Sequence, residues 1–182
     1  MKTAVELAEK GGFEAVRLRD VASTAGVALG TLYRRFRSKE DLLLAALDLE
    51  VVEHETRLRQ RPARGGTPLA RATSFFQVTT RAICRRPNLA RALVRAIAHG
   101  EPALTQKVAG FHSRMEKMIT ASLRGEGVDG SEPTEEERAL ANALQQVWFA
   151  SLVGWAGGLH GQGAIVEQTR TAADLMLRGA GR

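Results

Sequence analysis

The chain has 182 residues, enough for one sizeable hydrophobic core or for one core and a small additional domain. Hydrophobic residues make up 44%, so we expect a globular protein, and no run of residues is apolar enough for a transmembrane helix. The N-terminus lacks the basic-then-apolar pattern of a signal peptide, so we expect a cytoplasmic protein with no membrane partner. The only cysteine, Cys84, excludes an intramolecular disulfide, and we expect it to be a small buried side chain.

The net charge is +6, and 21 of the 26 basic residues are arginines. Ten of these arginines lie between Thr56 and Gly100, where the chain has no Asp or Glu. Because arginine can bind a phosphate group through two hydrogen bonds, this charge distribution is compatible with a nucleic-acid partner or an anionic ligand. An arginine- and alanine-rich coding bias in a GC-rich genome would give the same composition, so charge alone leaves both explanations open.

The pattern of the whole chain predicts an all-α fold. Apolar residues recur every three or four positions, and Gly or Pro separates one such segment from the next. The predicted helices are 2–11, 18–25, 29–36, 39–59, 68–86, 88–99, 102–125, 134–157 and 164–178. Thr134 and Glu137 form a capping box that starts one of them, after a predicted solvent loop at 125–131. Short helices precede residue 47 and long amphipathic helices follow it, so we expect a small domain at 1–47 and a larger helical domain at 48–182.

Residues 18–36 have the spacing of a helix-turn-helix unit. Two short predicted helices meet at Gly26, where a sharp turn requires a left-handed backbone that glycine adopts without steric cost. Ala22 is small enough for the second helix to cross closely. The alternative is an ordinary helical hairpin with a solvated basic face, but the turn, the small residue and the basic end together favour the helix-turn-helix. We expect a shared inner face formed by Val21, Ala25, Val27, Leu32 and Phe36.

The second helix of this unit exposes residues that suit the major groove of DNA. Its first turn is small, so it can approach the base edges, and hydroxyl groups and cations that can contact phosphates follow. Ser38 is expected to cap the next helix, which places Lys39 beside N-terminal amides where a phosphate can bind. We therefore predict that the DNA-binding residues are Arg17, Arg19, Ala28, Leu29, Gly30, Thr31, Tyr33, Arg34, Arg35 and Lys39.

These residues resemble the TetR family of bacterial transcriptional repressors. The resemblance is carried by Gly12-Phe13, Ala22 to Val27, Gly30 to Tyr33, Phe36 and Ser38 to Glu40. It implies about nine helices: a three-helix N-terminal DNA-binding headpiece, a fourth, connecting helix, and a C-terminal helical domain for ligand binding and dimerisation. A homodimer would then bind a palindromic double-stranded DNA operator. The sequence departs from the family at Arg17, where a Thr or Ser usually caps the second helix, and at Arg35, where His or Tyr is usual. The family also carries a basic arm and a longer first helix before the position of Met1.

A weaker resemblance is to the actinobacterial repressors of sterol catabolism, through residues 11–16 and 30–34 and through Val147-Trp148, Leu152 and Trp155. It implies a small hydrophobic effector, an acyl-CoA thioester of a sterol catabolite. By family analogy the last two helices form the dimer interface, with small residues at Ala143, Ser151, Gly154, Ala172 and Ala173. The candidate ligand-binding residues are Phe75, Phe76, Phe111, Met115, Met118, Trp148, Leu152 and Trp155, although plain core packing is the stronger explanation for any single one of them.

The leading hypothesis is a ligand-responsive repressor, in which an effector in the larger domain shifts the 39–59 helix and lowers the affinity for DNA. The alternative is a ligand-insensitive dimeric DNA-binding protein. We do not expect an enzyme, because the sequence has no Gly-x-Ser-x-Gly, Walker loop, His-Glu-x-x-His or paired-cysteine motif. The four histidines lack metal-ligand spacing, so we predict neither a metal nor a cofactor.

Overall fold

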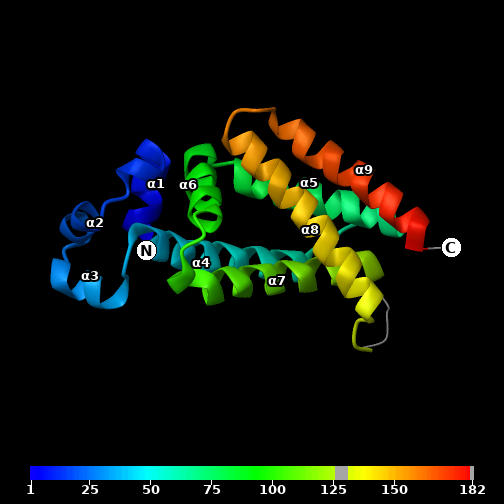
Figure 1. Cartoon of the computed structure of the whole chain (residues 1–182), viewed down its shortest axis with the longest axis horizontal. Coiled ribbons are helices and arrows are strands. Elements are labelled where there is room, and N and C mark those ends of the chain that lie inside the picture. The colour runs from blue at the N-terminus through cyan, green and yellow to red at the C-terminus, as the bar shows by residue number, and fades with distance from the viewer. Residues whose placement is uncertain (126–130, 181–182) are drawn as a thin grey trace. The chain divides into compact units, whose positions relative to one another are not determined.

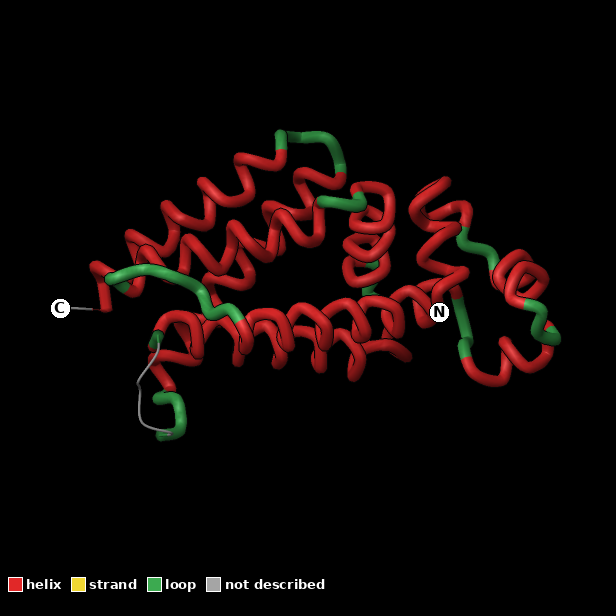
Figure 2. The backbone as a smooth tube through the Cα atoms, turned by 180° about the vertical axis from the view of Figure 1, so that it is seen from behind, coloured by secondary structure: helices red, strands yellow, loops and turns green. Residues whose placement is uncertain are grey.

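The computed structural model describes residues 1–125 and 131–180, and these residues form nine α-helices, one short 3-10 helix at Pro102–Leu104 and no strand (Figures 1 and 2). The predicted all-α fold is confirmed, and the predicted loop at 125–131 falls largely outside the described residues. No helix among the described residues is long and apolar enough to cross a membrane. The helices are α1 (Lys2–Ala15), α2 (Leu18–Ala25), α3 (Leu29–Arg35), α4 (Lys39–Gln60), α5 (Pro68–Cys84), α6 (Pro87–Ala98), α7 (Thr105–Arg124), α8 (Glu135–Ala156) and α9 (Gln162–Ala180).

The chain divides into two compact units. The first comprises Met1–Val52 and Ile83–Gly110, and the second comprises Glu53–Ala82 and Phe111–Arg182. The predicted DNA-binding domain at 1–47 therefore lies within the first unit, which also contains α6.

In the first unit, α1 packs against α6 through small and aromatic side chains. Ala4, Ala8 and Phe13 of α1 are buried, and the alanines allow a close approach of the two helices. Gly11 and Gly12 interrupt α1, and Gly12 has φ 68° and ψ −159°, a conformation that glycine adopts far more readily than other residues. The predicted helix end at residue 11 corresponds to this break, after which Phe13 turns into the core.

The second unit has an aromatic and aliphatic core, and α8 lies along α9 (Figures 1 and 2). The ring of Phe76 contacts those of Phe75 and Trp148 at centroid distances of 5.1 and 6.0 Å. The indole Nε1 of Trp148 donates a hydrogen bond to Thr80 Oγ1 at 2.9 Å, so this buried polar group is satisfied. The hydroxyl of Ser151 donates to Gln168 Oε1 at 2.6 Å and joins α8 to α9.

The predicted capping box at the start of α8 is confirmed. Thr134 Oγ1 accepts a hydrogen bond from the Glu137 amide, and Glu137 Oε2 accepts one from the Thr134 amide at 2.8 Å. Arg124 also contacts this carboxylate at 2.6 Å. The hydrogen bond from Arg124, followed by that from the Thr134 amide, lowers the pKa of Glu137 to about 2. This carboxylate therefore joins the end of α7 to the beginning of α8.

Cys84 is buried as expected, and this burial raises the pKa of its thiol to about 11. The side chain is therefore a small protonated core group at neutral pH, which makes it a poor nucleophile.

One expectation for the helix-turn-helix core is wrong. Val21 and Phe36 are buried and Leu32 is half-buried, but Ala25 is exposed and Val27 is 43% exposed. Both residues flank the turn at Gly26, at the outer end of the helix pair. Apolar residues continue at the expected spacing to the end of α2. The neighbouring elements, however, leave Ala25 and Val27 uncovered.

Candidate nucleic-acid interface and effector pocket

The turn between α2 and α3 has the geometry that the sequence predicts. Gly26 has φ 66° and ψ 29°, in the left-handed region. The amide of Val27 donates to the carbonyl oxygen of Ala22 at 3.0 Å, and the amide of Gly26 donates to that of Ser23 at 3.2 Å. These bonds satisfy the last carbonyl groups of α2 and reverse the chain sharply into α3.

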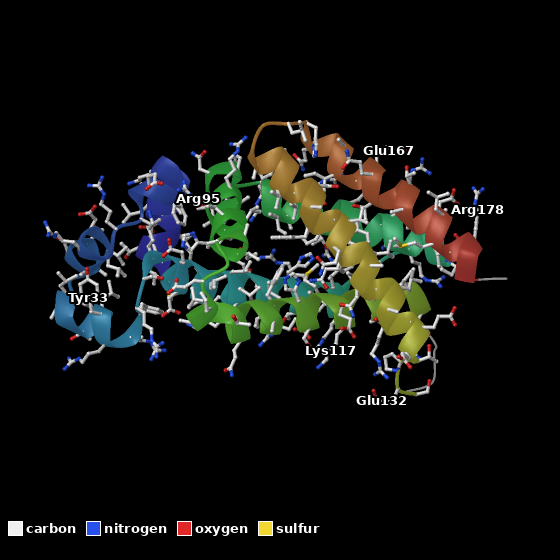
Figure 3. All side chains as sticks on the ribbon, in the orientation of Figure 1. Tyr33, Arg95, Lys117, Glu132, Glu167 and Arg178 are labelled. Atoms are coloured by element: carbon white, nitrogen blue, oxygen red, sulfur yellow. The ribbon has the colours of Figure 1, made fainter. Side chains whose placement is uncertain are left out.

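Helix α3 contributes no fully buried residue to the core, so nearly all of its surface is available to a partner. Thr31, Arg34 and Arg35 are exposed, and Tyr33 is 54% exposed (Figure 3). Arg34 donates a hydrogen bond to Thr31 Oγ1 at 3.1 Å, which orders both side chains on one face. At the entrance to the helix Ala28 and Gly30 are exposed and Leu29 is half-buried, so the first turn presents little steric bulk.

The structure places the cations predicted outside α3 in two different environments. Arg17 precedes α2 without a side-chain capping bond, and both Arg17 and Arg19 are exposed. Lys39 is 28% exposed, forms an ion pair with Glu14 at 3.1 Å and lies 4.0 Å from the centroid of the Phe13 ring. The free amide of Asp41 in α4 is capped by Ser38 Oγ at 3.2 Å, as predicted.

Glu14 contacts a second cation, Arg95 of α6, at 2.9 Å. The hydrogen bond and charge of Lys39, and then the charge of Arg95, lower the pKa of the Glu14 carboxyl. Lys39 is therefore partly neutralised within the first unit, which reduces the charge that it can offer to a phosphate.

All eight candidate ligand-binding side chains are buried in the second unit. They come from α5, α7 and α8, and none is more than 8% exposed. Met118 also lines a pocket. The other seven are also buried in the core: Phe75, Phe76, Phe111, Met115, Trp148, Leu152 and Trp155.

Two adjoining pockets open at the end of α4 and share Pro62, Ala63 and Gly125. The first has a volume of about 390 Å³ and a largely apolar wall that includes Leu58, Met118 and Ala121. Glu55, Arg59 and Lys117 lie at its edge, and Lys117 projects outward from α7 (Figure 3). An apolar chamber with charged groups at the edge suits an amphiphilic ligand.

The second pocket has a volume of about 610 Å³ and is strongly basic, with Arg61, Arg64, Arg71 and Arg124 in its wall. Arg71 has a structural role, because its guanidinium donates to the carbonyl oxygens of Ser122 and Leu123 at 3.1 and 2.6 Å and caps the C-terminus of α7. Arg61 and Arg64 are exposed. Sequence reasoning did not find this pocket, although the acid-free, arginine-rich segment was its signal.

The fold and these surfaces define a helix-turn-helix DNA-binding protein with a second helical unit that contains a basic and an apolar pocket. Among the described residues no cluster of His, Cys, Asp or Glu has the arrangement of a metal site.

Comparison with known proteins identifies the family. The model described as bacterial regulatory proteins, tetR family, matches residues 1–46, and the tetracyclin repressor-like C-terminal domain matches residues 65–176. The chain is 32% identical over 177 residues to the HTH-type transcriptional repressor KstR of Rhodococcus jostii (strain RHA1). The alignment covers 97% of this chain and 80% of the relative. The chain belongs to the TetR family of transcriptional repressors.

Solved structures agree with this assignment. A TetR transcriptional regulator from Rhodococcus sp. RHA1 has a TM-score of 0.84 at 26% identity, covering 97% of this chain and 92% of that one. The fold is also that of Thermus thermophilus FadR in complex with lauroyl-CoA, with a TM-score of 0.69 at 22% identity and coverage of 98% and 91%.

Proposed function

We propose that this repressor binds a palindromic operator as a homodimer and is released from it by an acyl-CoA thioester of a sterol catabolite. The observation that carries the effector part of the proposal is the pair of adjoining pockets in the second unit. Their chemistry matches the two ends of such a ligand, because one wall is apolar and the other holds four arginines.

The class of ligand is supported by charge. Coenzyme A carries phosphate groups, which arginine binds through paired hydrogen bonds, and its acyl group requires an apolar chamber. Arg61 and Arg64 are exposed in the basic pocket and can contact phosphate, while Met118 borders the apolar pocket and can adapt to an acyl group. The FadR structure with the same fold was solved with an acyl-CoA, lauroyl-CoA. The sterol origin rests on the resemblance of residues 11–16, 30–34 and 147–155 to repressors of sterol catabolism.

Exposed apolar side chains on the last two helices and in the loop between them support the homodimer. Leu159 is 82% exposed, Leu175 is 65% exposed and Val153 is 41% exposed. Of the small residues expected at the interface, Ser151 and Ala173 are already buried within the single chain. A dimer would also place two copies of α3 in successive major grooves, about 34 Å apart on one face of the duplex.

DNA binding is predicted to depend on α3. A protein with Tyr33→Ala and Arg34→Ala should lose most of its affinity for the palindromic DNA upstream of its own gene. The single variant Arg34→Ala should lower the slope of log affinity against log salt by about one, since one phosphate contact is lost. Arg138→Ala, at an exposed position of α8, is the matched control and should bind like the parent. Parental affinity in the double variant would overturn the assignment of α3.

The effector is tested by adding CoA thioesters to the preformed complex with DNA and measuring release. Sterol-derived thioesters should release the DNA, and Arg61→Ala with Arg64→Ala should raise the concentration required. Free CoA and the free sterol acids serve as controls, because each carries the chemical group for only one of the two pockets.

A ligand-insensitive DNA-binding protein is the second candidate. The aromatic core around Phe76 and Trp148 favours it, because the rings of these two candidate ligand residues pack against each other at a centroid distance of 6.0 Å. Operator binding that no thioester changes would establish this alternative.

A further inference from the structure

A polar side chain lies unsatisfied in the core of the second unit. Gln145 of α8 has no exposed surface, and its Nε2 hydrogen-bonds to Nδ1 of His112 on α7. Its other amide atom, Oε1, is buried and has no hydrogen-bond partner among the described residues. Because Gln145 donates to Nδ1, the imidazole carries its proton at Nε2. Burial lowers the pKa of His112, which keeps the ring neutral at physiological pH.

Apart from His112, the side chains around this amide are apolar or aromatic. Leu144 and Trp148, the residues beside it on α8, are fully buried. The rings of Phe111 and Phe149 meet the imidazole of His112 edge to face, at centroid distances of 5.3 and 5.9 Å. A buried carbonyl oxygen without a partner costs about 1–3 kcal/mol. Such locally unfavourable residues are expected where a protein binds a partner.

A second unsatisfied group lies on the facing helix. Thr120 of α7 is 3% exposed, and its hydroxyl has no partner among the described residues. On the outer side of the same pair of helices, Asn142 donates to Glu116 Oε2 at 3.1 Å, so this surface pair is satisfied. Two buried side chains, one on α7 and one on α8, therefore have unused hydrogen-bonding capacity.

Helix α7 connects the pair of Gln145 and His112 to the two pockets. Arg124 of the basic pocket lies twelve residues after His112, which corresponds to roughly 18 Å along a helix. Met118, in the wall of the apolar pocket, and Met115 lie between them on the same helix. Methionine side chains change conformation easily, so a ligand that enters at Met118 can displace them.

We propose that Oε1 of Gln145, held in place by His112, accepts a hydrogen bond from a hydroxyl group of the effector. The effector would thus be an apolar molecule whose hydroxyl lies at the opposite end from its CoA group. This inference rests on the proposed function and adds the residue that selects the ligand.

The test compares two CoA thioesters that differ by one hydroxyl group, lithocholoyl-CoA and 5β-cholanoyl-CoA, by isothermal titration calorimetry. The parent protein should bind the hydroxylated ligand about tenfold or more tightly, because a site built to pair with a hydroxyl discriminates strongly against its absence. Gln145→Leu should bind both equally, without losing affinity for 5β-cholanoyl-CoA. Asn142→Leu, one turn away at the exposed surface, should keep the preference of the parent.

The pattern of binding separates this role from a structural one, because a structural defect in Gln145→Leu would weaken the binding of both thioesters. Its urea midpoint is measured alongside, since the change also removes the hydrogen bond to Nδ1 of His112. Equal binding of the two thioesters by the parent, or a preference for the hydroxylated ligand that Gln145→Leu retains, overturns the inference about Gln145 alone. If neither thioester binds although the operator is bound, the acyl-CoA effector of the proposed function is overturned as well.

Discussion

Arg86, immediately before α6, places its Nη1 atom 2.9 Å from Oε1 of Glu9 in α1. Its Nη2 atom contacts Oε1 of Glu50 in α4 at 2.5 Å, so one guanidinium joins three helices of the first unit. Burial by itself would lower the pKa of Arg86, but the hydrogen bonds that it donates to Glu50 and Glu9 raise it. The arginine side chain is only 30% exposed, and this ion pair is therefore less screened than one on the open surface.

Replacing this arginine should destabilise the first unit. Arg86→Met keeps much of the side-chain volume but leaves two partly buried carboxylates unpaired, so we expect a loss of about 1–3 kcal/mol in the free energy of unfolding. Urea denaturation followed by circular dichroism measures this loss. Arg85→Met, at the exposed neighbouring position, is the control and should change stability little. Equal stability of the two variants would contradict the bridging role of Arg86.

The uncapped start of α2 predicts opposite effects on stability and DNA binding. Arg17 makes no side-chain capping bond, whereas a serine at this position can accept one from an amide of the first turn. Arg17→Ser should therefore raise the free energy of unfolding by about 1 kcal/mol. The same change removes an exposed cation, so affinity for the operator should fall, most clearly at low salt. Arg17→Ala separates the two effects, since it loses the charge and gains no cap.

The capping box of α8 predicts a specific loss of stability in acid. The pKa of Glu137 is lowered to about 2, so its charged form stabilises the folded state at every pH above its unfolded value near 4.5. This contribution should disappear as the pH falls from 4.5 toward 2. Glu137→Gln should reduce stability at neutral pH and flatten the pH dependence in that window. Glu136→Gln, in the same first turn but exposed, should keep the parental profile.

Two buried threonines should respond in opposite directions to the same substitution. The hydroxyl of Thr120 has no partner in the described chain, so Thr120→Val should stabilise the protein by about 1 kcal/mol. The hydroxyl of Thr169 donates to the carbonyl oxygen of Ile165 at 2.7 Å, and Thr169→Val should be neutral or destabilising. Thermal unfolding of both variants measures the difference. A lower midpoint for Thr120→Val would show that its hydroxyl has a partner in solution.

Most of the fold could be predicted because local signals determine it. Glycine and proline mark the helix ends, and the left-handed turn at Gly26 and the capping box at Thr134 each depend on residues a few positions apart. The exposure of Ala25 and Val27 could not be predicted in this way. Periodicity identifies an apolar face, but only the tertiary structure determines how far the neighbouring elements cover it.

The candidate site likewise has features that local patterns predict and contacts that they do not. The exposed groups of α3 follow from the spacing of Leu32 and Phe36, which turns the polar side chains outward. The pairing of Lys39 with Glu14 joins residues 25 positions apart, and no local pattern predicts it. Gln145 did leave a signal, because it is an amide directly beside Leu144 within the apolar stripe of α8, but a polar residue at that position is ordinarily interpreted as solvent-exposed.

The division into two units constrains how this protein can be cut or fused. Residues 83–110 belong with the N-terminal segment, and the boundaries between the units fall within α4, α5 and α7 rather than in loops. A fragment that ends at residue 47 would leave Ala4, Ala8 and Phe13 without the helix that they pack against. Transplanting the DNA specificity of this repressor onto another sensor therefore requires exchanging two separate stretches of sequence rather than the first domain alone.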